Sequence, residues 1–215
     1  MAPSLEVVYF ALPARGETTR VLLALGGIPF KDTHVGFGAE WEGLKPKAPF
    51  GQVPYLEVDG TIYAQSSAIE RYAASLAGVY PTSPLEQLKV DQLVAFAGEF
   101  WEPLVPTLSI ADAAEKAKAQ DSVAAKLQPK FEKLTSIIKA AGSGFLLGKD
   151  VSFADVQLYV VMSNLASGFF DGVPKDLLNS YPEVKAHHNK VASLPKIAAY
   201  YAAADGLRVA FKPLA

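Results

Sequence analysis

The sequence predicts a small α/β domain followed by an all-α domain, and three observations support this. Strand-like and helical patterns alternate over residues 4–76. From about residue 84 onward the apolar residues recur at helical spacing and strand-like runs disappear. Residues 77–84, which include the loop VYPTSP, fit a linker. We therefore expect one domain over residues 1–77 and another over residues 85–215.

The first domain is expected to follow the order β-α-β-α-β-β-α. The dipeptide Asp59-Gly60 joins two β runs, VPYLEVDG and TIYAQ, and favours a tight hairpin turn. In the helix that follows, Ser66 or Ser67 is expected to be the N-cap, and Gly78 is expected to end the helix. The remaining elements are expected as strands over 5–10 and 30–35, a helix over 17–25, and a short helix or turn over 40–47.

The second domain is expected to contain helices only. A long Ala- and Lys-rich helical pattern contains Pro129, which should kink or divide the helix. Ser152 and Asp155 match the S-x-x-D capping box, and the apolar run after them suits a helix through the middle of a bundle. Pro182 and Pro195 are expected to open two further short helices.

The composition excludes several classes of protein. Half of the 215 residues are hydrophobic, one fifth are charged, and the net charge of −2 gives no basic field for nucleic acid. No apolar run approaches the roughly 18 residues that a membrane span needs, and the start Met-Ala-Pro-Ser lacks a secretory signal pattern. The lack of cysteine excludes disulfides, cysteine-ligated zinc and a protein thiol nucleophile. With only three histidines we expect no metal site, and a reduced intracellular compartment.

Two local features carry chemical interest. Tyr9 ends the first predicted strand, directly before a loop that contains Arg15. A strand-end tyrosine is usually an amphipathic core residue with its hydroxyl at the surface, so its position alone assigns no catalysis. Val53-Pro54 begins a predicted strand, where proline removes a ladder donor. A cis bond there would turn the polar backbone groups of Val53 toward a peptide-like ligand, whereas a trans proline on an edge strand is the simpler alternative.

Four segments, YFALPARGE, PFGQVPYLEVDG, QSSAIERYAA and LLGKDVSFAD, occur in this order along the chain. In order and spacing they resemble the landmarks of cytosolic glutathione transferases, above all the sigma-like class that includes glutathione-dependent prostaglandin D synthases. The similarity covers essentially the whole chain. It implies a thioredoxin-like N-terminal domain that binds glutathione as co-substrate, an α-helical bundle domain, and a cytoplasmic homodimer. The lack of cysteine removes the omega-like thiol-transferase alternative.

The resemblance implies that Tyr9 is the catalytic residue and donates a hydrogen bond to the glutathione sulfur. A free thiol has a pKa of about 8.5, and a donor aimed at its sulfur stabilises the thiolate and lowers that pKa. Arg15 would add positive potential, although alone it is a solvated charge at a helix entry. The residues that match glutathione contacts are Tyr9, Arg15, Trp41, Lys45, Gln52, Val53, Gln65, Ser66 and Glu99.

The tripeptide has two carboxylates, one ammonium and two amides, and the match divides these groups among the residues. Gln65 and Ser66 would hold the γ-glutamyl carboxylate at a helix N-terminus. Gln52 would contribute its side chain and Val53 its backbone. Trp41 and Lys45 would reach the glycine end, although without the match they are surface helix residues.

Glu99 departs from the family pattern, in which an aspartate reaches across the dimer to the γ-glutamyl ammonium. Glutamate keeps the charge but is one methylene longer, and a solvated helical carboxylate is an equally good interpretation.

The electrophile pocket is expected between the domains. Its candidates are Leu12 and Ala14 from the first loop, Trp101 and Val105 from the first long helix of the second domain, and tail residues such as Leu207 or Phe211. Pro106 and Gln157 stand where prostaglandin synthases are expected to have aromatic residues. We therefore expect glutathione conjugation to small apolar electrophiles, with peroxidase or prostaglandin isomerase activity left open. The alternative is a non-catalytic ligand-binding or structural protein of the same fold.

Overall fold

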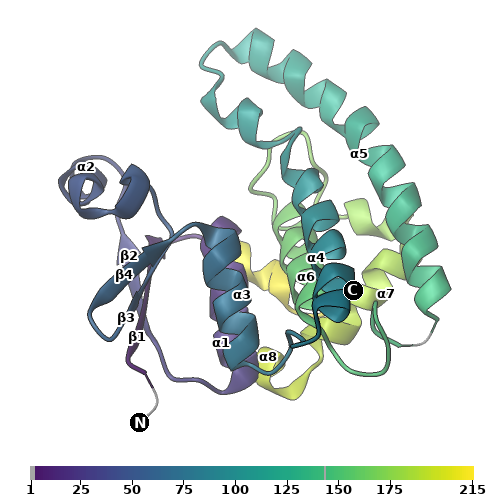
Figure 1. Ribbon diagram of the computed structural model, residues 1–215. Coiled ribbons are helices and arrows are strands. Elements are labelled where there is room, and N and C mark those ends of the chain that lie inside the picture. The colour runs from purple at the N-terminus through teal and green to yellow at the C-terminus, as the bar shows by residue number, and fades with distance from the viewer. Residues whose placement is uncertain (1–2, 143) are drawn as a thin grey trace. The chain divides into compact units, whose positions relative to one another are not determined.

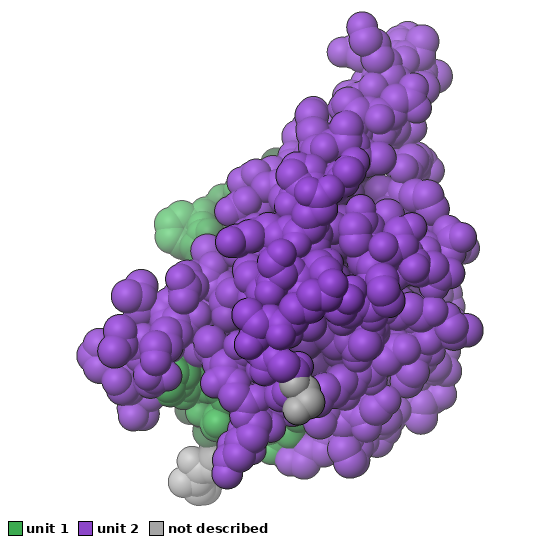
Figure 2. Space-filling model, turned by 90° about the vertical axis from the view of Figure 1, so that its right-hand side faces the viewer, with its two compact units in different colours: residues 1–81 green, residues 82–215 purple. Residues whose placement is uncertain are grey.

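The computed structural model describes residues 3–142 and 144–215 (Figure 1). The chain divides into two compact units, Met1–Pro81 and Thr82–Ala215, which Figure 2 shows in separate colours. Each unit has its own buried core.

The first unit is built on a mixed four-stranded sheet with the order β2-β1-β3-β4. β2 runs parallel to β1, whereas β3 pairs antiparallel with both β1 and β4. The helices α1 and α3 lie side by side against this unit's sheet (Figure 1). The elements, with η for 3-10 turns, are β1 (Leu5–Phe10), η1 (Ala14–Gly16), α1 (Glu17–Gly26), β2 (Lys31–Val35), α2 (Ala39–Leu44), η2 (Lys45–Lys47), η3 (Pro49–Gly51), β3 (Tyr55–Val58), β4 (Thr61–Ala64) and α3 (Ser66–Leu76).

The expected β-α-β-α-β-β-α order is confirmed, and the sequence explains one of its strands and one of its turns. β1 is an interior strand, so its central residues are buried on both faces and form a continuous apolar run. At the β3–β4 hairpin, Asp59 and Gly60 have φ values of 50° and 82°, as the tight turn predicted for this dipeptide requires. The Val53-Pro54 peptide bond is cis.

The predicted start of α3 is wrong by one residue if Ser66 is taken as the N-cap, and by two if Ser67 is. Gln65 is the N-cap, and α3 begins at Ser66, so neither serine caps the helix. The reason is the backbone of Gln65, whose φ of 73° turns the chain sharply after β4. Its carbonyl already accepts hydrogen bonds from the N–H groups of Ala68 and Ile69, at 2.9 and 3.1 Å. Left-handed backbone at a residue other than glycine is strained, and such strain gathers at functional sites.

The second unit consists of helices and 3-10 turns. α6 is buried along its whole length, which confirms a helix through the middle of the bundle. Pro182 and Pro195 open α7 and α8 as predicted. The elements are α4 (Pro84–Gly98), η4 (Glu99–Trp101), η5 (Val105–Ser109), α5 (Ala113–Ala141), α6 (Phe153–Ala166), η6 (Leu177–Ser180), α7 (Pro182–Ala192), α8 (Pro195–Tyr200) and η7 (Gly206–Phe211).

Two helix predictions in this unit need correction. Pro129 was expected to kink or divide its helix, and it does not divide it: α5 runs through Pro129 from Ala113 to Ala141 and has 29 residues in all. The proline removes one backbone hydrogen bond, but Leu127 and Phe131 on either side of it are buried and keep the helix packed. The first long helix of the unit was expected to include Trp101 and Val105, but α4 ends at Gly98 and 3-10 turns follow it. Within the described residues, no helix is both long and apolar enough to cross a membrane.

The predicted capping box at the start of α6 is confirmed and extends into a buried network. The Asp155 carboxylate accepts hydrogen bonds from the N–H groups of Ser152 and Leu146, both at 2.8 Å. The Ser152 hydroxyl and the His187 ring nitrogen Nε2 also contact it, at 2.6 and 2.8 Å. Burial alone would raise the pKa of the Asp155 carboxyl, but these hydrogen bonds together hold the pKa below its ordinary value.

Replacing Asp155 by alanine should destabilise the protein by about 3–5 kcal/mol, because His187 and two backbone N–H groups lose their partner in a buried site. Urea unfolding followed by circular dichroism measures this loss. The matched control is Asp150→Ala, at an exposed position in the preceding loop, which should change the free energy of unfolding by less than about 0.5 kcal/mol. Equal effects of the two substitutions would contradict a structural role for the network.

Candidate active site

Three chain segments of the first unit converge on one small pocket. The turn after β1 contributes Arg15, the segment before β3 contributes residues 52–54, and the junction of β4 and α3 contributes residues 64–66. Five residues that were matched to glutathione contacts therefore line the same pocket, although they are up to 51 positions apart in the chain: Arg15, Gln52, Val53, Gln65 and Ser66.

The pocket combines features that suit an anionic peptide. The exposed guanidinium of Arg15 supplies positive charge. The N-terminus of α3 begins at Ser66, where backbone N–H groups and the helix dipole favour a carboxylate. Val53 lies in the segment before β3, and its backbone N–H and C=O groups are of the kind that can pair with another peptide.

Tyr9 is buried at the end of β1, with 7% of its surface exposed. The backbone of Arg15 forms a hydrogen bond with the phenol, and the Arg20 guanidinium carbon lies 5.9 Å from the ring centroid. Burial raises the pKa of Tyr9 above its ordinary value near 10, and the backbone and charge of Arg15 and the charge of Arg20 offset only part of that rise. The hydroxyl therefore stays protonated at neutral pH and remains a hydrogen-bond donor.

Arg20 is a supporting residue that the sequence interpretation missed. It is fully buried, and its guanidinium is held by Glu17 at 3.0 Å, Asp32 at 2.9 Å and the Leu12 carbonyl at 3.2 Å. These contacts fix a positive charge beside the Tyr9 ring. The available signal was the pair Glu17 and Arg20 at i, i+3, the spacing at which opposite charges on a helix meet.

Trp41 and Lys45 do not line this pocket. Trp41, on α2, packs its ring edge-to-face against Phe10 at 5.8 Å and is partly buried. Lys45 begins η2 and is exposed, and its stem passes 3.9 Å from where a Cβ on Gly51 would lie. Both residues therefore belong to the same unit as the pocket, next to the segment that leads into Gln52.

The residues expected to hold the electrophile fall in both units. In the first unit, the Leu12 carbonyl accepts the Arg20 hydrogen bond, and Ala14 has a left-handed φ of 59°. In the second unit, Trp101 and Val105 lie in η4 and η5 beyond the end of α4, which corrects their placement on the first long helix. The Trp101 ring contacts Phe170 at 5.7 Å, and Val105 is exposed.

Two other predicted positions of the second unit, Glu99 and Phe211, have contacts within the unit. Glu99 pairs with Lys130 at 2.7 Å, so its carboxylate already has a cationic partner within the unit. Phe211 is fully buried and packs against Tyr159 and Tyr201, so it cannot line a pocket. The Tyr159 hydroxyl also donates to the Phe211 carbonyl. Sequence patterns did not predict that the C-terminal tail folds back into the core.

Comparisons with known proteins agree with this fold. The family model of the glutathione S-transferase N-terminal domain matches residues 5–75, and the C-terminal domain model matches residues 99–204. The chain is 35% identical over 198 residues to hematopoietic prostaglandin D synthase of Gallus gallus, covering 92% of this chain and 95% of that protein. It is 32% identical over 199 residues to glutathione S-transferase 1 of Ascaris suum, covering 91% and 94%.

Among solved structures, prostaglandin synthase D of Nilaparvata lugens is similar with a TM-score of 0.84 and 29% identity, covering 93% of this chain and 98% of that one. The first unit accordingly has the thioredoxin-like fold and the second is the helical domain. The chain belongs to the glutathione S-transferase family. Within residues 3–142 and 144–215, no cluster of three or more histidine or acidic side chains is arranged to hold a metal ion.

Glu70 is a buried acid that the sequence interpretation did not single out. It lies on α3, one helical turn after Ser66, with 5% of its surface exposed. Burial raises its carboxyl pKa from about 4.5 to about 7, against the lowering influence of the Arg71 and Arg15 charges. A Glu within a mostly apolar helix face was the available signal, because glutamate is seldom buried.

Replacing Glu70 by glutamine should make the protein more stable at high pH only. Below pH 4.5 the Glu70 carboxyl is neutral in both the folded and the unfolded state. Between pH 4.5 and 7 the folded state keeps a proton that the unfolded state loses. The free energy of unfolding of the wild type therefore falls as the pH rises. Above pH 8 the accumulated loss is roughly 3 kcal/mol. Urea unfolding at pH 5 and pH 8 measures the difference. Glu42→Gln, at an exposed site on α2, is the control; a stability gain for Glu70→Gln that does not depend on pH would contradict the raised pKa.

Proposed function

We propose that this glutathione S-transferase joins the sulfur of glutathione to small apolar electrophiles. The observation that carries the proposal is the buried Tyr9 hydroxyl, which burial keeps protonated beside two arginines. Such a donor stabilises a thiolate without itself becoming an anion. The peptide-binding features of the neighbouring pocket support glutathione as the thiol.

In the proposed reaction the bound thiol loses its proton to solvent, and the thiolate accepts a hydrogen bond from Tyr9. The sulfur lone pair then forms a bond to an electrophilic carbon, and the leaving group departs with its bonding electrons. A hydrogen bond to a charged group contributes about 1.5–3 kcal/mol, enough to lower the pKa of the thiol by about one to two units. Holding both reactants side by side supplies much of the remaining acceleration.

The tripeptide is proposed to lie along the pocket with its γ-glutamyl carboxylate at Gln65 and Ser66. Val53 would pair its backbone with the cysteinyl unit, next to the Gln52 side chain, and Arg15 would add positive potential. The glycine carboxylate would extend toward two further residues of the unit, the Trp41 indole and the Lys45 ammonium. Lys45 is exposed and close to the 51–52 segment, which supports this direction.

The electrophile is proposed to contact Leu12 and Ala14 of the first unit and Trp101 and Val105 of the second. Glu99 is proposed to reach the γ-glutamyl ammonium of glutathione bound to a partner subunit. For this contact its ion pair with Lys130 must break. We place the reaction in the cytoplasm, where glutathione is held reduced.

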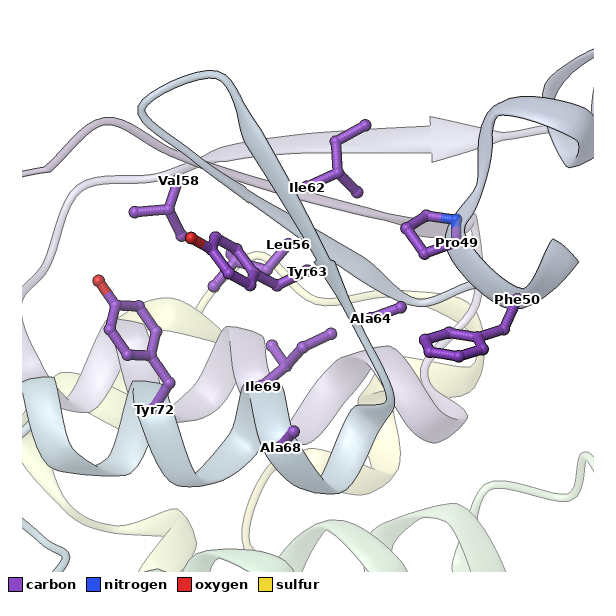
Figure 3. Close-up of a pocket in the computed structure, with 10 residues that line it drawn as sticks. All are labelled: Pro49, Phe50, Leu56, Val58, Ile62, Tyr63, Ala64, Ala68, Ile69 and Tyr72. Atoms are coloured by element: carbon purple, nitrogen blue, oxygen red, sulfur yellow. The ribbon is translucent and has the colours of Figure 1, made fainter.

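We propose that the protein pairs as a homodimer through an apolar groove of the first unit. The groove has a volume of about 580 Å³, and Phe50 lies at one end of it and Tyr72 at the other (Figure 3). Phe50 is 75% exposed and Tyr63 is 55% exposed. Large exposed apolar side chains that gather in one patch mark interaction sites. An exposed aromatic ring and a groove on one surface allow each copy to fill the other's groove about a two-fold axis.

Replacing Tyr9 by phenylalanine should lower turnover of 1-chloro-2,4-dinitrobenzene at pH 6.5 by about 10- to 100-fold, because the thiolate loses a charged hydrogen bond. The pH profile of kcat/KM should shift to higher pH by one to two units. Tyr200→Phe, at an exposed tyrosine of α8, is the control. If the wild type is retained on immobilised glutathione but turns over neither this compound nor cumene hydroperoxide, the result would favour a binding protein. If the wild type shows neither retention nor turnover, the result would favour a structural protein.

Replacing Phe50 by serine should weaken the dimer, because the exposed ring is proposed to enter the partner's groove. Light scattering after gel filtration at micromolar concentration should show a dimer for the wild type and a monomer for Phe50→Ser. Phe37→Ser removes a ring that is similarly exposed, at 69%, but lies outside the groove, and it should leave the dimer intact. A monomeric wild type would contradict the proposed pairing.

A further inference from the structure

The turn that follows β1 packs directly against the ring of Tyr9. Gly16 closes this turn and is buried. A Cβ atom added at Gly16 would lie 2.6 Å from Cδ1, 2.7 Å from Cγ and 2.9 Å from Cβ of Tyr9. Carbon atoms do not approach so closely without a shift, and these are the atoms nearest the backbone of Tyr9, so a shift would move the whole ring.

Gly16 is not needed for its backbone conformation. Its φ and ψ are −83° and −21°, which any residue adopts in a helix. Other glycines of this unit, such as Gly27 and Gly60, have the positive φ values that favour glycine. The requirement at position 16 is therefore for space beside the Tyr9 ring.

The other surroundings of the ring leave it little freedom to yield. Tyr9 lies within β1 and pairs in register with His34 of β2. The Phe10 ring lies 5.4 Å from it, and Arg20, itself held by two buried or partly buried carboxylates, lies 5.9 Å from its centroid. The backbone of Arg15, next to Gly16, bonds to the hydroxyl. One turn therefore holds both the ring and the hydroxyl.

We propose that Gly16 is a positioning residue, whose missing side chain sets how deeply the Tyr9 ring is seated and so where its hydroxyl meets the glutathione sulfur. The inference rests on the proposed function, because it gives Tyr9 its role at the sulfur. A methyl group at position 16 would tilt the ring and misplace the hydroxyl, while leaving the residues that bind the tripeptide in place.

The test is a double-mutant cycle of Gly16→Ala and Tyr9→Phe. Gly16→Ala should lower kcat at pH 6.5 by about tenfold to a hundredfold, because misplacing a catalytic group by an ångström has an effect of that size. The pH profile should shift upward, while KM for glutathione stays within about twofold. In the Tyr9→Phe background the same alanine should change kcat by less than about twofold, because the hydroxyl it misplaces is already absent. The control is Gly43→Ala on α2, where an added Cβ meets no atom within 4 Å.

An unchanged pH profile in Gly16→Ala, or effects of the two substitutions that multiply independently, would overturn the inference. If Gly16→Ala does not fold, the pair Gly16→Ala with Tyr9→Gly should be as stable as Tyr9→Gly alone, because no side-chain atom of residue 9 is left to meet the methyl. A pair that is less stable than Tyr9→Gly also overturns the inference. A wild type without turnover overturns the proposed function instead. In that case the ultraviolet absorbance of bound glutathione thiolate, measured on wild type and Gly16→Ala, still tests the role of Gly16. A smaller thiolate signal on the variant supports the positioning role, and equal signals overturn it.

Discussion

The proposed function depends on a phenol that must remain a hydrogen-bond donor while it faces positive charge. Arg15 and Arg20 favour loss of the Tyr9 proton, and burial opposes that loss and prevails. The same two charges would stabilise a thiolate brought to the hydroxyl. A solvated tyrosine at this position would keep its proton as well, but water would compete for its hydrogen bond and weaken it.

The positive charge of Arg20 beside this phenol is fixed by neighbours that do not take part in the proposed chemistry. Arg20 is held in place by Glu17 and Asp32, so its charge cannot move away from the ring. Arg15 is exposed toward the pocket, and the buried Glu70 opposes its charge when ionised. The positive potential at the pocket therefore depends on a carboxyl whose pKa of about 7 lies close to neutral pH.

Sequence patterns predicted the local structure well, and they failed where distant parts of the chain decide it. The Asp59-Gly60 hairpin and the Ser152–Asp155 capping box follow from short-range chemistry, and both are present. The N-cap of α3 was missed, because the strained backbone of Gln65 is set by its place between β4 and the helix. Pro129 was expected to kink or divide α5, and it does not divide the helix, because packing around it outweighs one lost hydrogen bond.

By itself the sequence determined the order of the elements, the family, and the residue types of the candidate site, because periodicity, turn chemistry and ordered motifs are local properties of the chain. Only the tertiary structure decided that Arg15, the 52–54 segment and the 64–66 junction line one pocket. It also decided that Gly16 leaves room for a ring and that Glu70 is buried. These are facts about which distant atoms approach each other, and close packing in three dimensions fixes them.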